Sequence, residues 1–240
     1  MKMAMNELVS LSRAALEGSG WAQGDYEDAA DAAVWLQAVG FDGIGALSSL
    51  LGATPVELYA VHGRTGIADP ARHAAGLVGC LAAFELAWAQ ATQDGIGIVR
   101  VTNAMAPRLA LFGLRTMGAR ARRFDIAWND AKGRHFATAS GCDVFPVYLG
   151  YDERDTGDRE GIVVCCRTDE DLPLPYDVAT DLRDGVSSAE LEARYDDTLW
   201  CGLEADETQI ARLGQWKTRV LVEATAASRE HGAGGQDDGF

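Results

Sequence analysis

The sequence lacks the short motifs that identify several large classes of enzyme. No lysine follows a glycine-rich loop, no G-x-S-x-G elbow occurs, and there is no H-E-x-x-H or paired-histidine spacing. The glycines of Gly95-Ile96-Gly97 precede an expected strand, whereas a dinucleotide fingerprint follows a strand and opens a helix. We therefore interpret them as a helix C-cap and a site of close packing.

The chain also lacks paired cysteines. Its five cysteines form no C-x-x-C pair and no Cys/His spacing of the kind that binds zinc, so no metal site is expected. An odd number of cysteines, two of them adjacent, is typical of reduced and buried thiols with a structural role. These residues are Cys80, Cys142, Cys165, Cys166 and Cys201.

No long apolar run indicates export or membrane insertion. The first residues form an amphipathic pattern with no apolar core of the kind found in a signal peptide. The most apolar stretch, residues 74–91, contains Glu85 and spaces its large side chains along one helix face. This pattern predicts a buried helix, and we expect a cytoplasmic protein with no membrane partner.

The charge is strongly acidic and unevenly distributed. A formal charge of −15 disfavours nucleic acid as a partner. From Arg100 to His135 there are eight Lys/Arg against two Asp, a net of +6, whereas Asp152 to Glu207 is strongly acidic. Either the two segments face each other or lie on solvated surface, or part of the basic segment lines a pocket for a carboxylate or phosphate.

Length and element order predict one α/β domain. A chain of 240 residues fits a single domain, here residues 1–231, followed by a flexible, acidic, glycine-rich tail at 232–240. A strand–turn–helix unit is typical of parallel sheet and a hairpin of antiparallel sheet, so the sheet should be mixed and partly parallel, with flanking helices. The expected helices lie at 6–17, 25–40, 54–62, 70–94, 107–117, from 187 and 207–228, and the strands at 96–101, 124–138 (a hairpin), 144–149, 162–166 and 199–203.

Two polar residues lie where ligands commonly bind. His62 is at the predicted end of a short helix beside Gly63-Arg64, which leaves open either a capping role or a role in proton transfer. Asn103 follows the carboxyl end of a strand, the edge where open α/β sheets bind ligands, although asparagine also suits a turn. The other three histidines, at 73, 135 and 231, are in a first helical turn, in the hairpin and beside the tail.

The segment from Phe84 to Asn129 resembles the core of the type 2 malate/L-lactate dehydrogenase family. The stretch GFDGIGALSSLL, from Gly40, is similar to that family's Gly-hydrophobic-Asp-Ser-His-Gly segment and retains Asp42. The resemblance implies a fold unrelated to Rossmann dehydrogenases, NAD(P) as the cofactor, and dimers with sites between subunits. It also implies small 2-hydroxy or imino acids as substrates.

This chain departs from that family at both of its histidines. Gly43 and Ile44 stand where the family has Ser-His, and Ala106 stands where the family's N-x-x-H-F-G turn has a catalytic histidine. Hydride transfer to a 2-hydroxy acid needs a proton donor or acceptor at the carbinol oxygen, and neither alanine nor isoleucine supplies one.

A second resemblance covers both ends of the chain. The segment LEGSGWAQGDYEDAADAAVWLQAVGFDG and the ending with Ser228, Arg229, Gly232 and Asp237 are similar to an uncharacterised bacterial family of unknown function. That family implies no activity.

The sequence therefore predicts a type 2 malate/L-lactate dehydrogenase-like α/β protein that binds a small anionic metabolite, a carboxylate, without the usual catalytic histidines. The first alternative is an NAD(P)-dependent oxidoreductase acting on a small 2-hydroxy or imino acid, and the second is a non-catalytic assembly subunit that forms a homodimer. His62 is the candidate for proton transfer, and the candidate ligand contacts are Arg64, Asn103, Arg108 and Arg229.

Overall fold

A computed structural model provides the three-dimensional structure of the chain. The described residues are 1–52, 65–67, 76–102, 104, 106–118, 123–130, 133–141, 144–151, 161–169 and 182–220.

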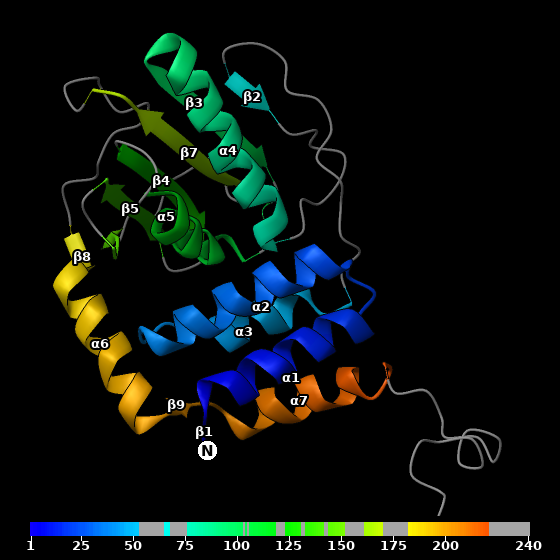
Figure 1. Ribbon diagram of the computed structural model, residues 1–240. Helices are drawn as coiled ribbons and strands as arrows, with labels where there is room; N and C mark the ends of the chain where they lie inside the picture. The colour runs from blue at the N-terminus through cyan, green and yellow to red at the C-terminus, as the bar shows by residue number, and fades with distance from the viewer. Residues whose placement is uncertain are drawn as a thin grey trace, which may run out of the picture.

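A mixed β-sheet forms one half of the described structure (Figure 1). Its seven described strands lie in the order β2-β3-β7-β4-β5-β6-β8. β2 and β3 pair in parallel and all other neighbours pair antiparallel, which confirms the predicted mixed, partly parallel sheet. The strands are β2 (Thr65–Ile67), β3 (Ile96–Thr102), β4 (Arg123–Asp130), β5 (Gly133–Ser140), β6 (Val147–Tyr151), β7 (Gly161–Arg167) and β8 (Leu182–Val186).

Two helices cover one face of this sheet. α4 (Gly76–Asp94) packs on β3 and β7, and α5 (Ala110–Gly118) packs on β4 and β5 (Figure 1). Alternate residues of β4 turn their apolar side chains to these helices, so that the Phe84 and Phe124 rings meet edge to face with their centroids 5.3 Å apart. The sheet face and the helices thereby share one apolar core.

Gly95, between α4 and β3, and Gly97, within β3, have the roles expected of them. Gly95 ends α4 with φ +84, a conformation that favours glycine. A Cβ at Gly97 would lie 1.9 Å from the Ala87 carbonyl oxygen, so only glycine lets the strand approach the helix this closely. The interpretation of a C-cap followed by close packing is confirmed.

The N-terminal helices form a second layer below the first (Figure 1). α2 is rich in alanine and largely buried, and it packs against α4 and α5 on one side and α1 on the other. α7 returns to lie beside α1, and the short strands β1 and β9 pair antiparallel nearby. The bounds are β1 (Lys2–Met3), α1 (Met5–Gly18), α2 (Gln23–Ala38), α3 (Gly43–Leu50), α6 (Ser188–Cys201), β9 (Leu203–Glu204) and α7 (Glu207–Lys217).

Local predictions differ from the structure in three places. The helix expected at 207–228 ends at Lys217, and residues 218–220 form a turn. The strand expected at 199–203 is mostly helix, because α6 continues to Cys201 and only Leu203–Glu204 is extended. The helix α3 was not expected, since its sequence is rich in glycine and serine. It forms because Asp42 caps its N-terminus, accepting a hydrogen bond from the Gly45 amide at 2.9 Å, and because its apolar residues are buried.

A buried ion pair joins two central strands on the sheet face opposite α4 and α5. Asp125 on β4 is fully buried and accepts hydrogen bonds from Nε and Nη2 of Arg167 on β7, at 3.0 and 2.7 Å. Burial and the nearby Asp125 carboxylate raise the pKa of Cys165 to about 12, so this thiol stays protonated at neutral pH.

The thiols only partly match the expectation of burial. Cys165 and Cys166 are buried and in no disulfide, as expected, whereas Cys201 is exposed.

No helix in the described part of the chain is both long and apolar enough to cross a membrane. Among the described residues there is also no cluster of His, Cys, Asp and Glu that would hold a metal ion.

Candidate functional site

Arg108 is the one predicted ligand contact that lies among the described residues. It is in the short 3-10 helix η1 (Pro107–Leu109), which follows β3. Ala106, immediately before η1, has φ 51 and ψ 53, a left-handed conformation that is rare for residues other than glycine. The conformation of Ala106 sets the direction in which the chain enters η1, which carries Arg108.

The Arg108 side chain is held by an aromatic ring and a carboxylate. Its guanidinium lies over the Phe41 ring, 5.7 Å from the centroid, and Nη2 is 3.5 Å from Oδ2 of Asp130 at the end of β4. The side chain retains 19% exposure, and that of Asp130 retains 30%. Both charges are therefore partly accessible to solvent.

A histidine and a tyrosine lie behind this pair. Nε2 of His135 lies 2.8 Å from Oδ1 of Asp130, a close contact without the geometry of a hydrogen bond. Nδ1 of His135 is hydrogen-bonded to the Tyr148 hydroxyl at 2.8 Å. His135 is fully buried, and its ring stacks on Trp128 with the centroids 4.9 Å apart. We call Arg108, Asp130, His135 and Tyr148 the sheet-edge cluster.

Strand register explains why these residues meet. His135 pairs with Trp128 across the β4–β5 hairpin, and Tyr148 pairs with Ala137 on the next strand. Because His135 and Ala137 are two residues apart, both project to the sheet face covered by the helices. β3 and β4 both run antiparallel to β7, so their carboxyl ends lie at the same edge and bring Arg108 beside Asp130.

The electrostatics of the cluster keep Tyr148 protonated. Burial is the main cause that raises the pKa of its hydroxyl, and the carboxylates of Asp184 and Asp130 act in the same direction. Arg108 opposes them by lowering the pKa. The neutral hydroxyl can thus either donate to His135 or accept from it, according to the tautomer of the ring.

The other predicted site residues lie outside the described part of the chain. These are His62, Arg64, Asn103 and Arg229. Arg108 lies in η1, a few residues after the end of β3, and a site at this strand end stays a prediction. Sequence reasoning missed His135, because it was treated as one residue of a hairpin. Matching the residues of the two hairpin strands outward from the turn would have placed His135 opposite Trp128.

Other arginines of the basic segment 100–135 are engaged elsewhere. Arg123 contacts the buried Asp125, with Nε 3.3 Å from Oδ1. The Arg115 guanidinium lies within cation–π distance of three rings, with 5.6, 5.3 and 4.9 Å to the centroids of Trp35, Phe145 and Tyr195. Arg108 differs from both in its position, because it lies beside Asp130 where β3 and β4 end.

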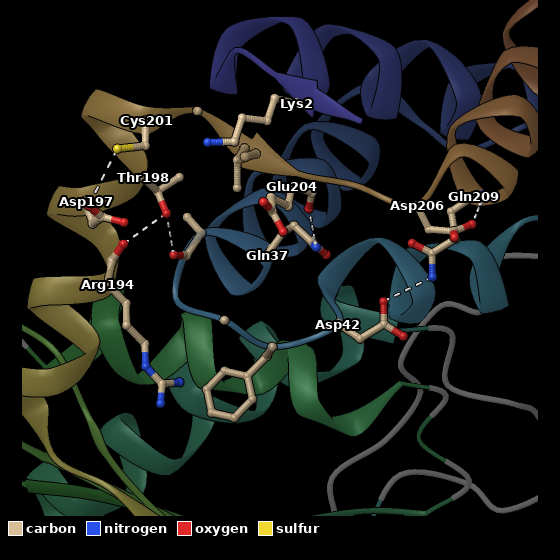
Figure 2. A pocket seen from close by; sticks show the side chains of 15 residues that line it. Lys2, Gln37, Asp42, Arg194, Asp197, Thr198, Cys201, Glu204, Asp206 and Gln209 are labelled. Carbon is tan, nitrogen blue, oxygen red and sulfur yellow. Dashed lines mark hydrogen bonds between the residues drawn. The ribbon is translucent and has the colours of Figure 1, made fainter.

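A pocket of about 530 Å³ lies between the α2–α3 connection, α6 and the β1–β9 pair (Figure 2). Many of its polar groups already bond to one another. Gln37 donates to the Glu204 carbonyl at 2.8 Å, and Thr198 donates to the Ala38 carbonyl at 2.9 Å. The polar groups of this pocket therefore mainly join the N-terminal helices to the C-terminal elements.

Phe41 connects the pocket with the sheet-edge cluster. It lines the pocket, and its ring meets that of Tyr148 edge to face, with the centroids 5.1 Å apart. Arg108 lies against the same ring.

The residues that resemble the dehydrogenase motif have structural roles in this pocket wall. Asp42 caps α3 and accepts a hydrogen bond from the Gln209 side chain at 3.1 Å. A Cβ at Gly43 would clash with the Ala33 carbonyl oxygen, at 1.9 Å, and Ile44 is fully buried in the core. The position that carries a histidine in the family is therefore filled by an apolar core residue here.

A known protein family matches the N-terminal part of the chain. The model of a protein family of unknown function (DUF3726) matches residues 3–88. No curated protein sequence matches the chain.

Several solved structures have a similar architecture. A dehydrogenase from Sinorhizobium meliloti has a TM-score of 0.66 at 13% identity, with 90% of this chain and 99% of that chain covered. Malate dehydrogenase from Entamoeba histolytica has a TM-score of 0.66 at 9% identity, covering 92% and 99%. Sulfolactate dehydrogenase from Methanocaldococcus jannaschii has a TM-score of 0.64 at 13% identity, with 92% of this chain and 97% of that chain covered. The chain thus has a malate/lactate dehydrogenase-like fold, which confirms the predicted fold class.

Proposed function

We propose that the protein binds a small anionic metabolite, a carboxylate, at the sheet-edge cluster, and that Arg108 is its anion contact. The observation that carries the proposal is the partly exposed Arg108 guanidinium at an edge where two strands end. Its Nε is buried and has no hydrogen-bond acceptor within the described residues. A planar guanidinium held from two sides is well suited to bind a carboxylate through two parallel hydrogen bonds.

Replacement of Arg108 tests this proposal. In the wild-type protein, a carboxylate that binds only the folded state raises the thermal midpoint in a concentration-dependent manner. The Arg108→Met variant keeps the apolar length of the side chain but loses its charge. We expect its affinity for the carboxylate to fall by roughly 10- to 100-fold, the effect of losing a charged hydrogen bond, measured by calorimetric titration.

The matched control is Arg13→Met. Arg13 forms an exposed ion pair with Asp31 on the N-terminal helices, so this variant loses one positive charge away from the sheet edge. It should bind the carboxylate as the wild type does. Unchanged affinity in the Arg108 variant would contradict the proposal.

A second candidate function is an NAD(P)-dependent oxidoreductase acting on a small 2-hydroxy or imino acid. The dehydrogenase-like fold favours it, as does a histidine–tyrosine pair in the cluster that contains Arg108. In this function His62 would exchange the proton and Arg64 beside it would contact the substrate, in place of the missing histidines.

Titration with NADH and NADPH distinguishes the two functions. The oxidoreductase requires saturable binding of one nicotinamide nucleotide per chain, measured by the change in nucleotide fluorescence. No binding at millimolar nucleotide would exclude this candidate and leave the carboxylate-binding function in place.

A further inference from the structure

We infer that the ligand of the sheet-edge cluster is an α-amino acid, in which an ammonium group is adjacent to the carboxylate. This inference rests on the proposed function and narrows its ligand class. It depends on Asp130, the partner of Arg108, which the sequence did not single out.

The outward-facing part of the cluster presents one charge of each sign. Arg108 and Asp130 keep 19% and 30% of their side-chain exposure, with Nη2 and Oδ2 3.5 Å apart. His135 and Tyr148 are buried behind them. A ligand that arrives from solvent therefore meets a guanidinium and a carboxylate side by side.

Charge complementarity favours a zwitterion at such a pair. A ligand carboxylate on Arg108 comes close to the Asp130 carboxylate, and the repulsion between the two anions weakens binding. An ammonium group next to the ligand carboxylate removes this repulsion, because it lies against Asp130 while the carboxylate lies against Arg108. The two charges of the ligand and those of Arg108 and Asp130 then form an arrangement in which each charge lies beside charges of opposite sign.

Each carboxylate oxygen of Asp130 lies near a different residue of the cluster. Oδ1 lies 2.8 Å from Nε2 of His135, and the imidazole is itself held by the Tyr148 hydroxyl and the Trp128 ring. Oδ2 of Asp130 faces Arg108. His135 thus lies against Oδ1 of Asp130, and Oδ2 is the oxygen beside which the ligand's nitrogen would lie.

Binding of matched pairs of ligands tests the inference. The pairs are L-alanine and L-lactate, L-serine and L-glycerate, and L-aspartate and L-malate, in which ammonium and hydroxyl groups exchange on the same carbon. We expect the wild-type protein to bind the amino acid of at least one pair about tenfold more tightly than its hydroxy acid, measured by calorimetric titration.

The Asp130→Asn variant provides the sharper measurement. It has the shape of the wild type but lacks the negative charge, so its preference should reverse in favour of the hydroxy acid. Asp31→Asn, which removes a carboxylate from an exposed ion pair, is the control and should keep the wild-type preference. Circular dichroism and the thermal midpoint establish that both variants are folded.

The outcomes separate this inference from the proposed function. If hydroxy acids bind as tightly as amino acids and Arg108→Met abolishes both, the carboxylate site stands and the amino-acid inference fails. The inference also fails if no amino acid binds at millimolar concentration, or if Asp130→Asn leaves the preference unchanged. Amino-acid binding that Arg108→Met does not weaken overturns both proposals at this cluster.

Discussion

Replacement of Asp125 by alanine is expected to lower the free energy of unfolding by about 3–5 kcal/mol, the range found when one partner of a buried ion pair is removed. Asp125 is fully buried, and Arg167, which donates two hydrogen bonds to it, is 4% exposed. The variant keeps the buried guanidinium but removes this carboxylate from it. Urea unfolding followed by circular dichroism measures the loss.

Asp31→Ala is the matched control. Asp31 pairs with Arg13 at 2.9 Å, but the two side chains are 42% and 39% exposed. Solvent screening limits such a pair to about 1 kcal/mol or less. Equal losses in the two variants would show that burial does not decide the contribution of the Asp125 pair.

Replacement of Gly97 by alanine should be the second large effect, with a loss of about 3 kcal/mol or more. The added Cβ would lie 1.9 Å from the Ala87 carbonyl oxygen and 2.9 Å from the Ala91 amide nitrogen. Both atoms belong to the backbone of α4, so no side chain can rotate away, and the helix must move off the sheet. The thermal midpoint and the urea midpoint should both fall.

Gly214→Ala adds the same methyl group where it meets nothing. Gly214 is in α7, and no atom lies within 4 Å of the position that its Cβ would occupy. Alanine is the better helix former, so this variant should gain about 0.5–1 kcal/mol. A loss in both variants would point to a general intolerance of alanine rather than to contact between α4 and β3.

The sequence predicted best those elements whose signals are local. Glycines and apolar spacing gave the end of α4, the start of β3 and the β4–β5 hairpin, because caps and alternation depend on neighbouring residues. The helix α3 was missed because its stability comes from burial of Ile44 and Leu47 and from the Asp42 cap, not from its helix propensity. At Leu199 the apolar pattern of a strand was outweighed by the continuation of α6.

The candidate site was only partly accessible to such reasoning. Arg108 could be proposed because it follows a strand end, a position that the sequence reveals. The contact of His135 with Asp130 and Tyr148 depends on the register of three strands, which only the folded sheet determines. Asp130 was counted as a charge within a basic segment, and its role as the partner of Arg108 follows from the shared direction of β3 and β4.

The backbone of Ala106, immediately before η1, favours a different kind of side chain from the one that is present. A left-handed backbone costs an ordinary residue roughly 1 kcal/mol, and histidine, asparagine and aspartate are the side chains that adopt it more readily. Ala106 is also the position that carries a histidine in the dehydrogenases that the sequence resembles. The backbone at Ala106 therefore has a conformation that histidine adopts more readily than alanine. The single substitution Ala106→His would place an imidazole two residues before Arg108, where the left-handed backbone suits it.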